Sequence, residues 1–185
     1  MAVHMDGARL GNALARINAP PDEATWKAGV DVLSFGATKG GAMGAEAIIF
    51  FDPKRSAGFD RRRKRGGHLL SKHRFAAAQM DAYLTDDLWL RLARHANTMA
   101  DRLSDRLTAT GMPPVWPVEA NEVFVLISRS ACDRLKGQGA AFYERRAENL
   151  PKAAIVGPHS VLVRLVTSFA TTAAEVDDFV TIASA

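Results

Sequence analysis

Two ionisable residues near the start of the sequence stand where two strand-like runs end. Asp6 follows the first run in VHMDGAR, and Lys39 follows the second in LSFGATKGG. The segment between the runs has helical spacing, so we expect the two strands to be parallel, with their carboxyl ends at one edge of a sheet. Ligands of such sheets bind just beyond those ends. Asp6 and Lys39 are therefore predicted to lie side by side and either to pair or to hold a ligand between them.

An amine and a carboxylate in this arrangement match the requirements of pyridoxal phosphate. That cofactor forms a Schiff base with a lysine amine, and its capacity to withdraw electrons depends on a carboxylate that keeps the ring nitrogen protonated. Small residues around Lys39 would let a bulky ring approach the backbone: Gly36, Ala37, Thr38, Gly40 and Gly41. On spacing alone, a structural ion pair between the two side chains is the alternative.

The elements that must position Lys39 and Asp6 alternate between strands and helices. Strand-like runs occupy residues 2–5, 31–35 and 45–51, and the last of these is read as a buried strand. A helix between the first two runs is predicted from the spacing of Leu10, Leu14 and Ile17. These signals predict a parallel sheet with a helical crossover.

The rest of the chain changes in character. Residues 54–83 are basic and then helical, and a long helix over 87–108 is predicted from one apolar face, made of Leu92, Ala96, Met99, Leu103 and Leu107. Prolines and a glycine in TGMPPVWP end that helix. The remaining elements predict a compact α+β unit: strands at 122–128 and 160–166, a helix near 131–147, and a last helix from about residue 173.

Composition limits the class of protein. A chain of 185 residues with 48% apolar content can bury a core, and a net charge of +4 with both signs scattered does not indicate a dedicated polyanion binder. The single cysteine, Cys132, excludes an internal disulfide framework and favours a reducing compartment, so we expect a cytoplasmic protein. No apolar run approaches the roughly 20 residues that span a bilayer, so no membrane span is expected.

Several other residues have a plain structural interpretation. The basic run 61–65 in FDRRRKRGG lacks interleaved aromatic residues, so we read it as a solvated helix face and expect no nucleic-acid binding. His68 and His73 are five residues apart and no acidic or cysteine cluster joins them, so no metal site is expected. Cys132, whose only charged neighbours in the sequence are Asp133 and Arg134, is read as an inert thiol, and His4 as a packing and hydrogen-bonding residue.

Three segments carry a resemblance to a known family. VHMDGARLGNA, then DVLSFGATKGGAMGAEAIIFF and much later VLVRLVTSF resemble the low-specificity L-threonine aldolases, which belong to the β-eliminating lyases and have the aspartate aminotransferase-like fold. The signal lies in D-G-A-R and S-x-G-x-T-K occurring in that order. The resemblance implies an α/β chain of fold type I: residues 1–83 as the remainder of a PLP-binding large domain, 84–110 as a long connecting helix, and 111–185 as a small C-terminal α+β domain.

The resemblance also implies an activity and roles for particular residues. The family cleaves L-threonine or L-allo-threonine, which are β-hydroxy amino acids, into glycine and acetaldehyde with pyridoxal 5'-phosphate. By motif, Lys39 resembles the Schiff-base lysine and Asp6 the partner of the pyridine nitrogen, while Arg9 would sit beside cofactor and substrate. Arg164 of VRLVTSF would bind the substrate carboxylate, for which a planar guanidinium is suited. Finally, a neighbouring subunit's cofactor phosphate would be contacted by Lys72 or Arg74, which implies a homo-oligomer.

One departure from the family leaves two hypotheses open. The sequence begins inside the strand that leads to D-G-A-R, so about half of a family member has no counterpart in it. The chain is thus read as part of an L-threonine aldolase or, alternatively, as an inactive interaction fragment or half of a related PLP lyase or transaminase. We expect the 185-residue chain on its own to be inactive as an aldolase and either to self-associate or to be marginally stable, because strands would lack sheet partners.

Overall fold

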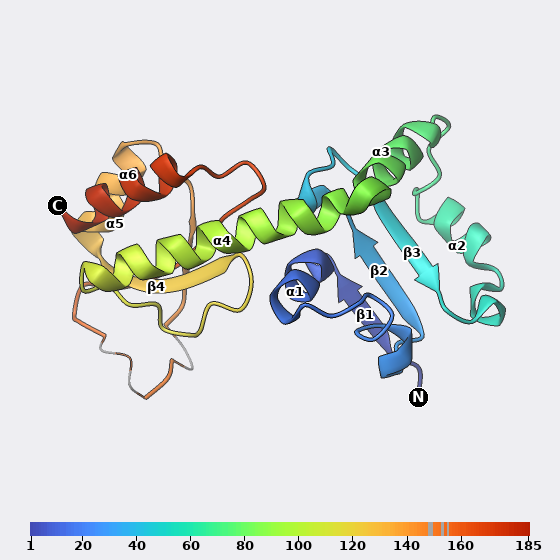
Figure 1. The fold of residues 1–185 in the computed structure, drawn as a ribbon, viewed down its shortest axis with the longest axis horizontal. Coiled ribbons are helices and arrows are strands. Elements are labelled where there is room, and N and C mark those ends of the chain that lie inside the picture. The colour runs from blue at the N-terminus through green and yellow to red at the C-terminus, as the bar shows by residue number, and fades with distance from the viewer. Residues whose placement is uncertain (148–149, 153, 155) are drawn as a thin grey trace. The chain divides into compact units, whose positions relative to one another are not determined.

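The structure is a computed structural model that describes residues 1–147, 150–152, 154 and 156–185. The chain divides into two compact units, Met1–Ala93 and Arg94–Ala185 (Figure 1). The boundary falls inside helix α4 (Leu88–Ala109). The presence of α4 confirms the long helix predicted over residues 87–108. Each unit has a sheet and a hydrophobic core of its own.

The first unit contains a three-stranded sheet in the order β1-β2-β3. Strands β1 (His4–Gly7) and β2 (Val32–Gly36) are parallel, and helix α1 (Leu10–Ile17) lies between them in the sequence, as predicted. Strand β3 (Glu46–Phe50) pairs with β2 in the antiparallel direction. Figure 1 shows the three strands side by side in the first unit, with α1 next to β1.

The core of the first unit lies between this sheet, α1 and the first turns of α4. Leu10 and Leu14 of α1 are buried, whereas Ile17, at the end of the predicted helix face, is exposed. Phe35 of β2 packs edge to face on Trp89 of α4, with 5.4 Å between the ring centroids. The remaining buried apolar members of this core are Leu33, Ala37, Ala45 and Tyr83.

The prediction that residues 45–51 form a buried strand is wrong about burial. Ile48 and Ile49 of β3 are 42% and 37% exposed, respectively. The reason is position: β3 is the last strand in the described order and pairs with β2 alone. Apolar side chains on such an edge strand have neighbours on one side only.

The segment after β3 is helical and exposed. Helices α2 (Phe59–Arg65) and α3 (Arg74–Leu84) occupy the stretch that the sequence marked as basic and then helical. The basic run is exposed on α2 except for the half-buried Arg63, as expected of a solvated helix face. Single 3₁₀ turns complete the unit at Trp26–Ala28, Thr38–Gly40, Pro53–Ser56 and Thr85–Asp87.

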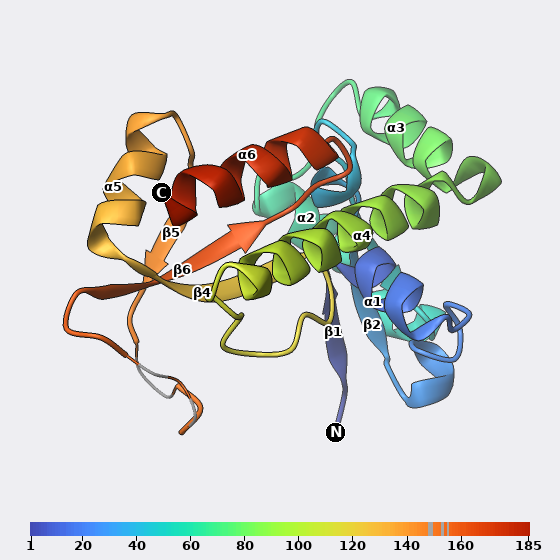
Figure 2. The same ribbon diagram turned by 60° about the vertical axis from the view of Figure 1, so that its left-hand side comes forward.

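The second unit contains an antiparallel sheet in the order β4-β6-β5. Strands β4 (Glu122–Ser128) and β6 (Ser160–Val166) have the bounds predicted from their alternating apolar residues. Helix α6 (Ala173–Ser184) begins where the last helix was predicted. Figure 2 shows α6 alongside β6 within this unit.

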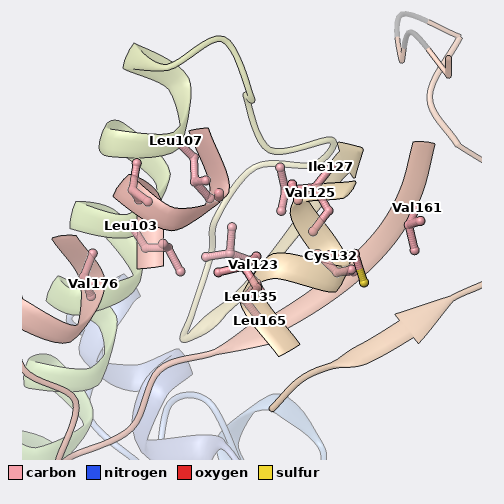
Figure 3. Packing of buried hydrophobic residues seen from close by; sticks show 14 of the residues in the cluster. Leu103, Leu107, Val123, Val125, Ile127, Cys132, Leu135, Val161, Leu165 and Val176 are labelled. Atoms are coloured by element: carbon pink, nitrogen blue, oxygen red, sulfur yellow. The ribbon is translucent and has the colours of Figure 1, made fainter. Parts of the chain in front are cut away.

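One face of the second sheet is buried under helices. Alternate residues of β4, namely Val123, Val125 and Ile127, pack against Leu103 and Leu107 of α4 (Figure 3). Residues of α5 (Arg129–Gly137) and α6 join the same core, among them Cys132, Leu135, Val176 and Val180. Because side chains alternate along a strand, residues between these buried ones face the opposite side of the sheet.

The predicted helix at 131–147 is wrong in its second half. Helix α5 ends at Gly137, and Gly139 follows with a φ of 90°, a left-handed conformation that glycine adopts without strain. The chain then forms strand β5 (Tyr143–Arg145), which pairs with β6. Glycine after the last helical turn is a common helix stop, and the longer helix prediction did not take this signal into account.

Candidate active site

Lys39 lies on a closed loop directly after β2. It is the central residue of the turn Thr38–Gly40, and its side chain is exposed. The loop is closed at its base, where the backbone N–H of Ala37 donates to the carbonyl oxygen of Ala45 at 3.0 Å. The Ala45 N–H in turn donates to Oγ1 of Thr38 at 3.3 Å. These bonds fix the backbone on both sides of the amine.

Helix α3 holds the far side of the same loop. Oε1 of Gln79 accepts hydrogen bonds from the backbone N–H groups of Met43 and Gly44, at 2.9 and 3.2 Å. The residue after the lysine, Gly40, lies against the phenol of Tyr83, so closely that a Cβ there would come 1.8 Å from the hydroxyl oxygen. Only glycine therefore fits at position 40. Burial also raises the pKa of the Tyr83 phenol. The loop backbone is thus held by α3 while the amine of Lys39 stays accessible.

Asp6 lies on the neighbouring parallel strand. It was predicted to follow the first strand, but it is the third residue of β1, paired in register with Ser34 of β2. Its side chain is exposed, and Oδ1 accepts a hydrogen bond from the backbone N–H of Ala8 at 3.0 Å. Among the described residues, no ion pair joins Asp6 to Lys39. Both side chains are exposed, near the carboxyl ends of adjacent strands.

A glycine brings these two strand ends together. A Cβ on Gly36, the last residue of β2, would come 3.1 Å from the Cα of Ala8 and 2.6 Å from a carboxylate oxygen of Glu46. Contacts below about 3.4 Å are tighter than ordinary van der Waals packing, so a side chain there would push the D-G-A-R turn away from β2. Both motifs therefore depend on the same close approach.

The remaining candidates of the first unit have simpler settings. His4 is exposed, and its Nε2 lies 2.8 Å from Oγ of Ser34, so it forms a hydrogen bond as expected but does not pack in the core. Arg9 is half-buried and directly precedes α1. Lys72 and Arg74 are exposed at and before the start of α3, and the guanidinium of Arg74 lies over the ring of Phe75, 5.2 Å from its centroid.

Arg164 belongs to the second unit and lies on its central strand, β6. In register it stands between Phe124 of β4 and Tyr143 of β5. Its Nη1 lies 3.3 Å from Oε1 of Glu122, and its guanidinium carbon lies 5.2 Å from the centroid of the Tyr143 ring. This guanidinium is held on the side of the sheet that faces away from the helices.

Cys132 is buried as predicted, but its charged surroundings differ from the sequence-based expectation. The contacts come from Arg129 and Glu144 rather than from Asp133 and Arg134: Sγ lies 3.7 Å from Oε1 of Glu144 and 3.9 Å from Nη1 of Arg129. The fold brings Glu144 here because β5 pairs with β6 beside α5. Burial raises the pKa of the Cys132 thiol, which fits an inert group.

Two further absences concern the described part of the chain. No helix in it has both the length and the apolar character needed to cross a membrane. Within the same residues, no three side chains among histidine, cysteine, aspartate and glutamate gather closely enough to hold a metal ion.

Sequence reasoning missed the residues that support the candidates. Gln79 and Tyr83 of α3 position the Lys39 loop, and nothing in their local sequence marks them for that contact. Glu122 and Tyr143 flank Arg164. Of these, only Glu122 had a signal, because an acid and a base on two paired strands are expected to meet diagonally across the ladder.

The arrangement supplies two of the groups that pyridoxal phosphate requires. An accessible amine on a fixed loop would bind an aldehyde covalently, and an accessible carboxylate at the neighbouring strand end would hold a proton on a ring nitrogen. The glycines at positions 36 and 40 keep side chains out of the close contacts around both groups. The residues present therefore fit this cofactor in type and accessibility.

Comparison with known proteins gives a consistent relationship in sequence. The family model for beta-eliminating lyases matches residues 1–130. The low-specificity L-threonine aldolases of Pseudomonas aeruginosa and of a Pseudomonas sp. strain are each 47% identical to the chain over 142 residues, which is 76% of this chain and 41% of each relative. The chain thus matches about two fifths of the length of these relatives.

Solved structures show the same relationship in three dimensions. A threonine aldolase from Leishmania major is 27% identical, with a TM-score of 0.83 over 98% of this chain and 51% of its own. A putative L-allo-threonine aldolase from Listeria monocytogenes, at 18% identity and a TM-score of 0.71, covers all of this chain and 52% of its own. A serine palmitoyltransferase from Sphingomonas wittichii is 14% identical, with a TM-score of 0.64 over 99% of this chain and 46% of its own. The predicted fold class, an α/β chain of the fold type I group, is confirmed.

Proposed function

Because the chain belongs to the beta-eliminating lyase family, we propose that it carries the cofactor-binding lysine of an enzyme that cleaves L-threonine or L-allo-threonine into glycine and acetaldehyde. The observation that carries the proposal is the exposed amine of Lys39 on a fixed loop, next to the strand that bears Asp6. The relatives that are most informative in sequence are L-threonine aldolases, which act on small amino acids.

Lys39 and Asp6 would hold pyridoxal phosphate, the cofactor of this family. When bound, the cofactor accepts electrons from the Cα–Cβ bond of the substrate as that bond breaks. Lys39 would bind the aldehyde carbon and release it when the substrate amine arrives. The carboxylate of Asp6 would keep the ring nitrogen protonated, and its hydrogen bond from the Ala8 N–H fixes the orientation in which it does so.

The other proposed roles follow from charge. Arg164 would bind the substrate carboxylate, because a guanidinium presents two parallel N–H donors to the two carboxylate oxygens. Arg9, half-buried in the turn after β1, would lie beside cofactor and substrate. In a homo-oligomer, Lys72 or Arg74 would contact a neighbouring subunit's cofactor phosphate, and their exposure leaves them accessible for it.

The alternatives are part of another PLP enzyme and an inactive interaction fragment. Likeness to the serine palmitoyltransferase is at 14% identity and concerns the fold alone. The identity of 47% to the Pseudomonas aldolases extends over 76% of this chain, which supports the aldolase over a related transferase.

A chimaeric enzyme tests the proposal without depending on where this chain begins. The part of the Pseudomonas aeruginosa aldolase that corresponds to this chain is replaced by residues 1–185, and glycine and acetaldehyde are measured with L-threonine. We expect turnover in the chimaera and a loss of at least about a thousandfold on Lys39→Ala. Lys54→Ala, an exposed lysine after β3, is the matched control and should keep full activity.

Peptide mapping supplies a second readout of the same assignment. After incubation with pyridoxal phosphate and reduction with borohydride, the peptide that contains Lys39 should carry the cofactor. A chimaera that folds and binds the cofactor yet forms no acetaldehyde contradicts the proposed reaction. Labelling that persists on another lysine after Lys39→Ala contradicts the proposed residue.

A further inference from the structure

The face of the second sheet opposite the helices carries an ion pair between two neighbouring strands. Glu122 and Phe124 of β4 alternate with the buried Val123 and therefore face away from the helices. Arg164 of β6 is opposite Phe124 in register, so Glu122 is its diagonal neighbour on the same face. The register of the two strands thus brings a carboxylate to the guanidinium.

The guanidinium is only partly neutralised by this pair. A single contact of 3.3 Å joins Nη1 of Arg164 to Oε1 of Glu122, in place of two short parallel bonds. Nε of Arg164 is buried and has no hydrogen-bond acceptor among the described residues. The ring of Tyr143 lies on the guanidinium from the other neighbouring strand. A second carboxylate that approaches the exposed part of the guanidinium would therefore meet a charge that Glu122 has not saturated.

The pair is also accessible to small molecules. The side chains of Arg164 and Glu122 are 22% and 25% exposed. Two open depressions border them. Arg164 lines one of about 520 Å³ together with Tyr143, and Glu122 lines another of about 560 Å³ together with Trp116 and Phe124. An anion that enters the first depression reaches Arg164, whose guanidinium is paired with Glu122.

A carboxylate ligand in this position is repelled by Glu122. Two negative charges a few ångströms apart at a partly exposed site oppose each other, and Glu122 also competes for the same N–H donors. The affinity of Arg164 for a carboxylate therefore depends on how firmly Glu122 occupies it.

We propose that Glu122 is a resident competitor at Arg164: its carboxylate occupies the guanidinium in the ligand-free protein and sets an upper limit on the affinity for a carboxylate ligand. Glu122 is in this sense a positioning residue, since it acts through Arg164. The inference rests on the proposed role of Arg164 as the group that binds the substrate carboxylate. It adds to that role a built-in weakening of ligand binding, which favours release of a carboxylate product such as an amino acid.

The test is a titration of the ¹⁵N-labelled 185-residue chain with acetate at constant ionic strength, followed through the Nε–Hε resonance of Arg164. Arg164→Lys identifies that resonance by its loss. We expect Glu122→Gln, which keeps the shape and removes the charge, to tighten acetate binding at least about fivefold. Glu119→Gln is the matched control. Glu119 lines the same depression as Glu122 and carries the same charge, but among the described residues it forms no ion pair with Arg164.

The outcomes separate the inference from the assignment on which it rests. Tighter acetate binding by Glu122→Gln, and not by Glu119→Gln, supports the proposal. A substitution that merely loosens the fold would not tighten acetate binding. Unchanged or weaker binding in Glu122→Gln, including no detectable binding in either protein, overturns the proposal. If shifts of other resonances show that acetate binds equally well to wild type and to Arg164→Lys, the role of Arg164 itself fails.

Discussion

At the scale of single residues, Glu144 is, among the residues that the structure describes, the side chain whose ionisation is most strongly perturbed by its contacts. Arg129 donates two hydrogen bonds to its carboxylate, at 3.2 and 3.0 Å, and Lys136 adds a third contact. These cations lower the pKa of Glu144 from its ordinary value of 4.5 to about 2. The acid thereby links β5 to helix α5 across the edge of the second sheet.

This pairing predicts a pH dependence of stability. Because the pKa of Glu144 is lower in the folded than in the unfolded chain, its stabilising contribution is present above pH of about 4.5 and is lost as the pH falls towards about 2. Glu144→Gln should lower the thermal midpoint at pH 7 by a few degrees. Its difference from wild type should shrink between these two pH values.

Thermal unfolding followed by circular dichroism at several pH values measures this effect. Glu119→Gln, an exposed acid without an ion pair among the described residues, serves as the control and should follow wild type throughout. A Glu144→Gln difference that stays constant from pH 7 to pH 2 would show that the lost contacts are steric and not ionic.

At the scale of elements, the loop that carries Lys39 depends on its contact with α3. The phenol of Tyr83 occupies the space that a side chain at Gly40 would need, while a Cβ at Gly44 in the same loop meets nothing within 4 Å. We predict that Gly40→Ala destabilises the protein by about 1–3 kcal/mol through overpacking, because the buried Tyr83 must move. Gly44→Ala should change stability by less than about 0.5 kcal/mol.

Urea unfolding of both variants gives the comparison, and near-ultraviolet circular dichroism reports on the packing of the aromatic side chains, Tyr83 among them. A changed tyrosine signal in Gly40→Ala alone is expected. Equal stability of the two variants would mean that the loop is free to shift away from α3, in contradiction to the hydrogen bonds from Met43 and Gly44 to Gln79.

Elements with a clear periodic signal were predictable from the sequence. Strand β6 alternates around Arg164 and was placed with its observed bounds, as was α4 to within about one residue. Local composition was misleading where tertiary position decides: the apolar run of β3 reads as buried, but an edge strand leaves Ile48 exposed. The helix predicted through residue 147 ends at Gly137, because Gly139 takes the left-handed conformation that stops a helix.

The same distinction applies to the candidate site. Lys39 and Asp6 were found because short motifs and strand ends mark them in the sequence. The hydrogen bonds of Gln79 to the Lys39 loop, and the contact of Arg164 with Glu122, join residues that are 35 or more positions apart. Such contacts depend on register and packing, which a single sequence specifies only through the whole fold.

At the scale of the whole molecule, the first sheet has two edge strands among the strands that the structure describes. β1 and β3 each pair with β2 alone among the described strands, and β3 exposes the apolar Ile48 and Ile49. Exposed apolar edge strands pair with other chains. We therefore predict that the 185-residue chain self-associates as its concentration rises, and that Ile48→Lys shifts it towards the monomer.

Sedimentation velocity over a range of protein concentrations measures this self-association. Ile17→Lys is the matched control, because Ile17 is also exposed but lies at the end of a helix, where no backbone groups await a strand partner. A monomer at all concentrations, or an equal effect of both lysine substitutions, would rule out the edge of β3 as the cause.

The order in which the Lys39 loop forms follows from the bonds that hold it. The ends of the loop, Ala37 and Ala45, are close in sequence, and segments of that size meet in about 10–100 ns. Gln79, by contrast, lies 36 and 35 residues beyond the two amides that it binds, and contacts of longer separation form later. On a ribosome, the turn that presents Lys39 therefore closes early but reaches its final shape only after α3 has been synthesised and docked.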